Sequence, residues 1–131
     1  MLLTPTYYVM KMYNVHQDAT LVPINIDSPT YDFRGKKLPA ISASASKDAG
    51  SMNISLTNID YSKAQEITIN VRGEDFTKIS GTILSSEKIQ DFNSFENPNK
   101  IVTKPFNGAK LEKNQIKITI PAFSVVVLNL K

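Results

Sequence analysis

Cysteine and tryptophan are absent from this chain of 131 residues, and histidine occurs once. Without cysteine, no disulfide framework and no thiolate metal site can form, and the composition does not distinguish a reducing from an oxidising compartment. One histidine, His16, cannot by itself supply a catalytic triad or a set of metal ligands. His16 follows a predicted helix, so we expect it to cap the helix end or to form a local hydrogen bond.

Long apolar runs and blocks of like charge are also missing. No stretch approaches the ~20 apolar residues that a membrane helix requires, and Met1–Leu3 is too short for the apolar part of a signal peptide. An export signal would therefore have to precede Met1, and the localisation stays open. The 15 basic and 12 acidic side chains are spread evenly along the chain. This distribution lacks the basic patch of a nucleic-acid-binding protein, so we predict neither nucleic acid nor membrane as a partner.

Motifs for cofactors, metals and catalysis are not found either. The five glycines form no GxGxxG or other phosphate-binding loop. Four scattered aspartates lack the spacing of a calcium loop: Asp27, Asp32, Asp60 and Asp91. Glu74 and Asp75 are the one adjacent acidic pair, and they lie in a predicted turn where neighbouring side chains point apart. We therefore predict no cofactor, no metal and no catalytic residue, which argues against an independent small enzyme.

Most of the chain alternates between apolar and polar residues with a period of two. Strict alternation places one face of a strand in a core and the other in water. Turn signals such as Arg34-Gly35 and Asp48-Ala49-Gly50 separate these short runs. The pattern predicts an all-β antiparallel sandwich or jelly roll over residues 18–131. The expected strands are Leu21–Ile26, Pro39–Ser46, Met52–Thr57, Ile67–Val71, Ile79–Ile83, Ile116–Ile120 and Phe123–Leu130.

One short helix is expected before the sandwich. Thr4 can act as an N-cap, and Pro5 suits the first helical position. The helix is apolar nearly all round, with Lys11 and Asn14 on one narrow stripe. A helix of this kind is normally buried on most sides. We therefore predict an interdomain or self-association face made of Tyr7, Tyr8, Met10, Met12, Tyr13 and Val15.

Aromatic side chains offer one alternative function. Sandwich domains that bind sugars usually stack them on exposed aromatic rings, so Tyr31 and Phe33 are candidates for a sugar platform in a carbohydrate-binding module. We expect most aromatic residues of the sandwich to fill the ends of its core instead: Tyr31, Phe33, Phe76, Phe92, Phe95, Phe106 and Phe123.

Four stretches of the sequence resemble one enzyme family. They are TPTYYVMKMYNVHQDATLVPI at 4–24, ISASASKDAGSMNISLTNID at 41–60, FNSFENPNKI at 92–101 and IPAFSVVVLNLK at 120–131. Together they are similar to the end of the catalytic barrel and the C-terminal domain of glycoside hydrolase family 51 α-L-arabinofuranosidases. The likeness runs over nearly the whole chain, and its first stretch is the most specific part.

The resemblance implies a longer parent enzyme. That enzyme would be a retaining hydrolase that releases terminal α-L-arabinofuranosyl residues from arabinan, arabinoxylan or arabinogalactan. Its two catalytic glutamates would precede this chain, so the resemblance assigns no catalytic residue here. Residues 1–17 would hold the last helix of a (β/α)8 barrel, at Thr4–Asn14, and residues 18–131 would form the sandwich that packs beside the barrel.

The same resemblance explains a helix that is apolar on two sides, because one side would face the barrel and the other the sandwich. Without the barrel, one apolar side would be left bare, which favours self-association or rearrangement. For the isolated chain we therefore predict a homodimer through the helix, or a helix folded back on the sandwich.

Overall fold

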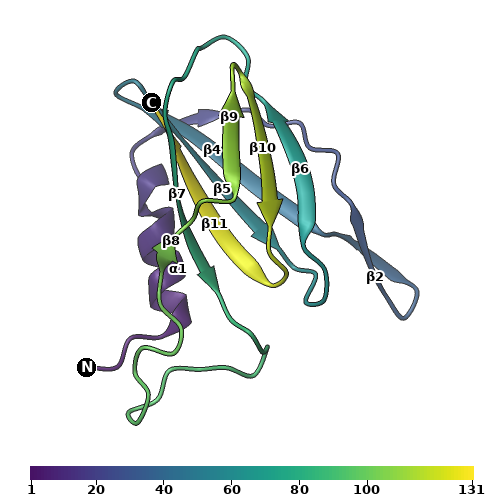
Figure 1. Ribbon diagram of the computed structural model, residues 1–131, viewed down its shortest axis with the longest axis vertical. Coiled ribbons are helices and arrows are strands. Elements are labelled where there is room, and N and C mark those ends of the chain that lie inside the picture. Colours follow the sequence, from purple (N-terminus) through teal and green to yellow (C-terminus); the bar gives the residue numbers. More distant parts are fainter.

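The computed structural model describes residues 1–131 and contains a helical start followed by eleven strands (Figure 1). The helical elements are α1 (Pro5–Tyr13) and the 3-10 helix η1 (Asn14–His16). The strands are β1 (Thr20–Val22), β2 (Thr30–Phe33), β3 (Lys36–Pro39), β4 (Ile41–Asp48), β5 (Ser51–Asn58), β6 (Gln65–Asn70), β7 (Ile79–Ser85), β8 (Lys104–Pro105), β9 (Ala109–Glu112), β10 (Gln115–Ile120) and β11 (Ser124–Leu130).

The predicted helix start is confirmed. Thr4 is the N-cap of α1, and its hydroxyl oxygen accepts a hydrogen bond from the backbone N–H of Tyr7 at 3.3 Å. Pro5 occupies the first turn, where its missing N–H is not needed. With nine residues, α1 is far shorter than a membrane-crossing helix, and no helix of the structure is long and apolar enough for that role.

The strands form two packed sheets and one separate hairpin. The larger sheet has six strands in the order β1-β4-β5-β11-β7-β8, and the smaller has three in the order β6-β10-β9. Every paired strand is antiparallel to its neighbour. Figure 1 shows β9, β10 and β6 lying over the larger sheet, with α1 alongside. The predicted all-β sandwich with one N-terminal helix is confirmed.

The main core lies between the two sheets. One face of the larger sheet meets the isoleucines of β10, and such burial of apolar surface is the main driving force for folding. We call this side of the larger sheet its inner face, and the other side its outer face. The central side chains are less than 2% exposed: Ile41, Leu56, Ile116, Ile120, Val126, Leu128 and Leu130.

A buried amide joins the two sheets at one end. The Asn58 side-chain N–H groups donate to the carbonyl oxygens of Lys63 at 3.0 Å, Ile120 at 3.3 Å and Pro121 at 3.1 Å. Its carbonyl oxygen accepts from the backbone N–H of Asp60 at 3.0 Å. Asn58 is 1% exposed, so these bonds satisfy a polar group that water cannot reach.

The smaller sheet covers only part of the inner face of the larger one. A cleft of about 660 Å³ opens between β6 and the segment formed by the end of β1 and the irregular residues 23–29. Its walls include apolar side chains of β4, β5 and β6, such as Ala43, Ile54 and Ile67. The interior of the sandwich is therefore accessible along this one edge.

The two predicted turns are confirmed by their backbone angles. Arg34 has φ 51° and Gly35 has φ 77°, the left-handed pair that a tight two-residue hairpin requires. Ala49 at φ 42° and Gly50 at φ 81° form the equivalent turn between β4 and β5. Both turns join strands that pair in register.

Several strand predictions were incomplete. The predicted strand Leu21–Ile26 ends at Val22, because Pro23 has no N–H to donate to a neighbouring strand. The hairpin β2–β3 and the strands β8 and β9 were not predicted. These strands have only two to four residues each, and the hairpin is largely exposed. The other predicted strands are present, with ends shifted by a few residues.

Candidate functional site

The adjacent carboxylates Glu74 and Asp75 make separate structural contacts. Glu74 forms an ion pair with Lys47, and Asp75 accepts a hydrogen bond from the Asn114 side chain at 2.7 Å. The adjacent pair therefore has two different partners and does not converge on one point. No group of three or more histidine, aspartate or glutamate side chains lies close enough to hold a metal ion.

Asp60 organises a turn between β5 and β6. One of its oxygens accepts from the backbone N–H of Ser62 at 2.9 Å, from the Ser62 hydroxyl at 2.9 Å and from the backbone N–H of Lys63 at 3.1 Å. Hydrogen bonds from Ser62, chiefly that of its backbone, hold the pKa of Asp60 below the usual aspartate value. This carboxylate stabilises a turn and stays ionised.

The helix α1 packs on the outer face of the larger sheet through a small second core. Met12 is buried there with Leu84 of β7, Ile101 and Val127 of β11. Tyr8, Val9 and Tyr13 are partly buried against the same cluster. Of the two arrangements predicted for the isolated chain, the structure has the helix packed on the sandwich.

Polar contacts continue this interface beyond Met12. The Tyr13 hydroxyl lies 3.2 Å from the Thr57 hydroxyl. His16 Nδ1 lies 2.6 Å from Ser46 Oγ, and His16 Nε2 lies 2.9 Å from Ser55 Oγ. These serines are 30 and 39 residues away in sequence, so the prediction of a local role for His16 was wrong. The histidine instead attaches the end of the helical segment to β4 and β5.

The bonding of Ser55 indicates which nitrogen of His16 carries the proton. Ser55 Oγ donates to the Ser44 carbonyl at 3.4 Å, so its lone pair accepts from His16 Nε2–H. Nδ1 then accepts from the Ser46 hydroxyl, and both nitrogens of the neutral ring are bonded. Burial lowers the pKa of His16, which favours this neutral form.

The six residues of the predicted helix face fall on two sides of the helical segment, five of them in α1 and Val15 in η1. Met12 is buried, and Tyr8 and Tyr13 are half-buried against the sandwich. The other three are exposed: Tyr7 by 42%, Met10 by 71% and Val15 by 38%. The helix thus has an apolar side toward the sheet and further apolar side chains turned to solvent.

A long loop, residues 86–103, runs between β7 and β8 beside the start of α1. Lys100 Nζ lies 2.7 Å from Asp91 Oδ1, and the Ser86 hydroxyl and the Lys88 backbone N–H donate to Asp91 Oδ2. The Lys100 ammonium, followed by the Ser86 hydroxyl, lowers the pKa of Asp91 to about 2. The aspartate therefore stays charged and joins the two ends of the loop.

Asn93 holds the same loop to the N-terminal segment. Its side-chain N–H groups donate to the carbonyl oxygens of Leu3 at 2.9 Å and Ile101 at 2.8 Å. Its own carbonyl oxygen accepts from the Ile101 backbone N–H at 2.7 Å. Asn93 is 6% exposed, so this three-bond arrangement fixes the position at which the chain leads into α1.

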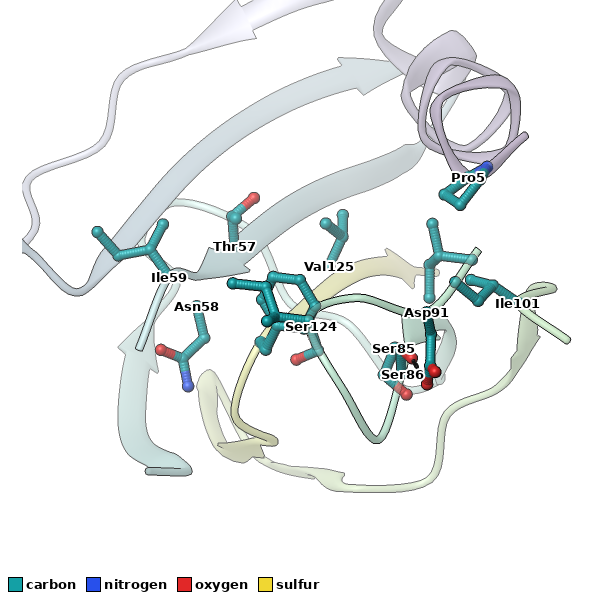
Figure 2. A pocket seen from close by; sticks show the side chains of 13 residues that line it. Pro5, Thr57, Asn58, Ile59, Ser85, Ser86, Asp91, Ile101, Ser124 and Val125 are labelled. Atoms are coloured by element: carbon teal, nitrogen blue, oxygen red, sulfur yellow. Dashed lines mark hydrogen bonds between the residues drawn. The ribbon is translucent and has the colours of Figure 1, made fainter. Parts of the chain in front are cut away.

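A pocket of about 280 Å³ lies between the start of α1, the sheet and this loop (Figure 2). Figure 2 shows Pro5 on one side of the pocket, with Asp91 and Ile101 from the loop opposite Thr57 and Val125 from the sheet. Its lining is largely apolar, with Ser85, Ser86, Ser124 and Asp91 at its polar end. Asp91 is the one carboxylate that lines it, whereas glycoside hydrolases use a pair.

The two residues of the predicted sugar platform lie on the exposed hairpin β2–β3. Tyr31 and Phe33 lie on β2, where Tyr31 is half-buried and Phe33 is exposed. The planes of the Tyr31 and Tyr61 rings are inclined by 74° to one another. The Arg34 guanidinium lies 5.1 Å from the centre of the Phe33 ring. A sugar platform at Tyr31 and Phe33 stays a prediction.

The aromatic residues do not mainly fill the core ends, contrary to expectation. Phe76 is buried and Phe106 is half-buried, whereas Phe33, Phe92, Phe95 and Phe123 are exposed. The exposed aromatic residues of the 86–103 loop were not identified as a surface feature from sequence, although FNSFE shows two phenylalanines among polar neighbours.

Comparison with known proteins identifies the class to which this architecture belongs. Residues 1–124 match the family model described as the alpha-L-arabinofuranosidase C-terminal domain. An intracellular exo-alpha-L-arabinofuranosidase of Bacteroides ovatus is 47% identical over 133 residues, which cover 100% of this chain and 26% of that protein. The chain therefore belongs to the alpha-L-arabinofuranosidase C-terminal domain family.

Solved structures agree with this assignment. The GH51 arabinofuranosidase from Xanthomonas axonopodis pv. citri superposes with a TM-score of 0.97 at 33% identity, over 100% of this chain and 27% of that one. The family 51 alpha-L-arabinofuranosidase from Bifidobacterium longum superposes with a TM-score of 0.87 at 20% identity, over 99% of this chain and 26% of that one, which shows the shared fold. The chain thus spans about a quarter of the length of these relatives.

Proposed function

We propose that this chain is the non-catalytic accessory domain of an α-L-arabinofuranosidase and that it packs on a catalytic (β/α)8 barrel in the same polypeptide. In this proposal α1 is the last barrel helix, so that residues 1–17 belong to the barrel and residues 18–131 form the accessory sandwich. The sandwich stabilises the barrel by covering one of its sides. The catalytic part, with its two glutamates, supplies the chemistry.

One observation carries the proposal. The whole chain aligns with its relatives, yet it covers only 26% and 27% of their lengths. In these relatives, the residues outside the matched domain are therefore nearly three times as many as the residues within it. The exposed apolar side of α1, at Tyr7 and Met10, is the kind of surface that this additional chain would cover.

The proposed substrates follow from the names of the relatives, which are arabinofuranosidases. The longer enzyme would release terminal α-L-arabinofuranosyl residues from arabinan, arabinoxylan or arabinogalactan. The domain itself would not need to touch the polysaccharide, because the additional chain that the relatives have would hold the catalytic site. A carbohydrate-binding module is therefore the less favoured function.

The test introduces a charge on the exposed side of α1 in the full-length reading frame. Met10→Asp should lower the melting temperature of the full-length protein by several degrees, because a carboxylate would become buried against the barrel. The matched control is Thr68→Asp, on the solvent side of β6 and opposite Lys117. We expect the control protein to melt close to the unmodified one.

Two results would contradict the proposal. Equal melting temperatures for Met10→Asp, Thr68→Asp and the unmodified protein would show that α1 has a free outer side. A measurable affinity of residues 1–131 for arabinan would favour the carbohydrate-binding module. Homodimer formation through Tyr7, Met10 and Val15 stays a prediction for the isolated chain, and sedimentation velocity measures it directly.

A further inference from the structure

We propose that the loop between β7 and β8 forms a second contact to the catalytic part of the same polypeptide, with Phe92 and Phe95 as the side chains that become buried. This inference rests on the proposed function and extends it from α1 to a separate element. The inference concerns five exposed side chains of α1 and this loop: Tyr7, Met10, Ile89, Phe92 and Phe95.

The loop holds a fixed shape without any partner. Asp91 connects Ser86 and Lys88 at its beginning to Lys100 near its end. Asn93 connects its middle to Ile101, which is itself buried against Met12 and Leu84. A loop fixed in this way presents its remaining side chains at defined positions, which lowers the entropy lost on binding.

The side chains that this fixed loop presents are large and apolar. Ile89 is 60% exposed, Phe92 67% and Phe95 84%. Isolated exposed apolar residues are ordinary, but three within seven positions of one loop mark a contact surface. Aromatic residues are also enriched at the centres of protein interfaces. Packing within the sandwich does not explain these three apolar side chains, since neither Ile89 nor the two phenylalanines belong to a core cluster.

The position of the loop indicates what covers it. Asn93, which binds the Leu3 carbonyl, lies between Phe92 and Phe95 in the sequence, and Pro5 and Ile89 line the same pocket. Figure 1 shows the N-terminus beside this loop. In the relatives, nearly three quarters of the chain lies outside the matched domain. A catalytic part joined at Met1 would therefore reach the rings at high effective concentration, which favours it over a second copy of the chain.

Single cysteines give a direct test, because the domain contains none. Phe92→Cys, Phe95→Cys and the control Lys117→Cys are made in the full-length reading frame. Each protein reacts with a maleimide, and peptide mass spectrometry measures the labelling rate at that site relative to its rate in urea. Lys117 lies on the solvent side of β10, and its side chain is 57% exposed.

The proposal predicts a reversal of the order of exposure. In this structure the Phe95 site is more exposed than the Lys117 site, so without a partner it should be labelled at least as fast. With the catalytic part in place, we expect positions 92 and 95 to be labelled about tenfold more slowly than position 117, because labelling then requires local opening. Glu96→Cys, beside Phe95, should be slowed as well and replaces either variant that fails to fold.

Three outcomes would overturn the inference. Equal labelling of all sites in an active full-length arabinofuranosidase would reject the loop contact and leave the proposed function intact. A reading frame that begins at Met1 would reject both. Slow labelling that becomes fast on dilution would identify a second copy of the chain as the occupant.

Discussion

The two faces of the six-stranded sheet differ in composition and in what covers them. The inner face is apolar along its central strands and packs on the three-stranded sheet. The outer face mixes serine, threonine and asparagine with a few apolar side chains, and α1 and η1 cover part of it. The inner face therefore forms the main core, open along one edge, whereas the outer face forms an interface to a helix that itself has another exposed apolar side.

Strand β5 shows both faces in one element. Its inner side chains include Ile54 and Leu56, and its outer side chains include Asn53 and Ser55. All four are buried, although alternation alone predicts that the second pair lies in water. Ser55 is covered because His16 binds it, and Asn53 accepts a hydrogen bond from Asn129 at 2.8 Å. A polar outer position can thus be a buried interface position.

The largest effect should come from the inner face. Leu128 is 0% exposed and lies in the middle of β11. Leu128→Ala should lower the free energy of unfolding by about 3 kcal/mol, because it removes buried methyl groups and leaves a cavity. Urea denaturation followed by circular dichroism measures the change. A loss below about 1 kcal/mol would show that the inner face is not the main core.

A smaller and more local effect is expected on the outer face. Met12→Ala should weaken the packing of α1 by about 2 kcal/mol. This value is near the lower end of the range for replacing a buried methionine by alanine, because the cluster around Met12 borders solvent. The amides of α1 should then exchange hydrogen faster, while those of β11 keep their protection. Hydrogen exchange with mass spectrometry separates the two elements. Equal acceleration in both would mean that helix and sandwich unfold as one unit.

The histidine should make this helix contact sensitive to pH. Burial lowers the pKa of His16 below its ordinary value of 6.5, so the folded state favours the neutral ring. The stabilisation of the folded state by the neutral His16 ring is therefore complete above pH 6.5. It is lost as the pH falls through the lower pKa that His16 has in the folded state. We expect exchange in α1, corrected for intrinsic rates, to accelerate between pH 7 and pH 5.

The matched variant is His16→Gln, which keeps polar contacts and removes the titration. Because His16 is the one histidine of the chain, the pH dependence between pH 7 and pH 5 should disappear with it. An equal acceleration in His16→Gln would assign the effect to another group.

The smallest effect on global stability should come from the loop. Asp91→Asn removes the charge that binds Lys100, so amides of residues 86–101 should exchange faster while the unfolding midpoint changes little. Since the pKa of Asp91 lies at about 2, its contribution is present above pH 3.8 and is lost only as the pH falls through about 2. Unchanged exchange in the loop would show that Asn93 alone fixes it.

Much of the fold could be predicted from sequence because one rule dominates it. Period-two alternation identified the strands of the inner core, and Thr4-Pro5 located the start of α1. The hairpin β2–β3 was missed, although Tyr31 and Phe33 alternate with Thr30 and Asp32, because each strand has only four residues and most of its side chains are exposed.

The candidate surface was only half predictable. A helix that is apolar all round implied two covered sides, and the structure shows Met12 on one and Met10 on the other. The loop was not recognised, since Phe92 and Phe95 were expected in the core. Their exposure depends on Asp91 and Asn93, whose partners lie up to 90 residues away, as in the contact of Asn93 with Leu3. Sequence spacing does not reveal such long-range contacts.

The most direct measurement compares arabinofuranosidase activity in two purified proteins. Residues 1–131 and the full-length reading frame are each assayed on an aryl α-L-arabinofuranoside at equal molar concentration. We expect the full-length protein to release the aryl group and residues 1–131 to release none, since the proposed catalytic glutamates lie in the additional chain. Turnover by residues 1–131 would contradict the accessory role, as would a full-length protein without activity.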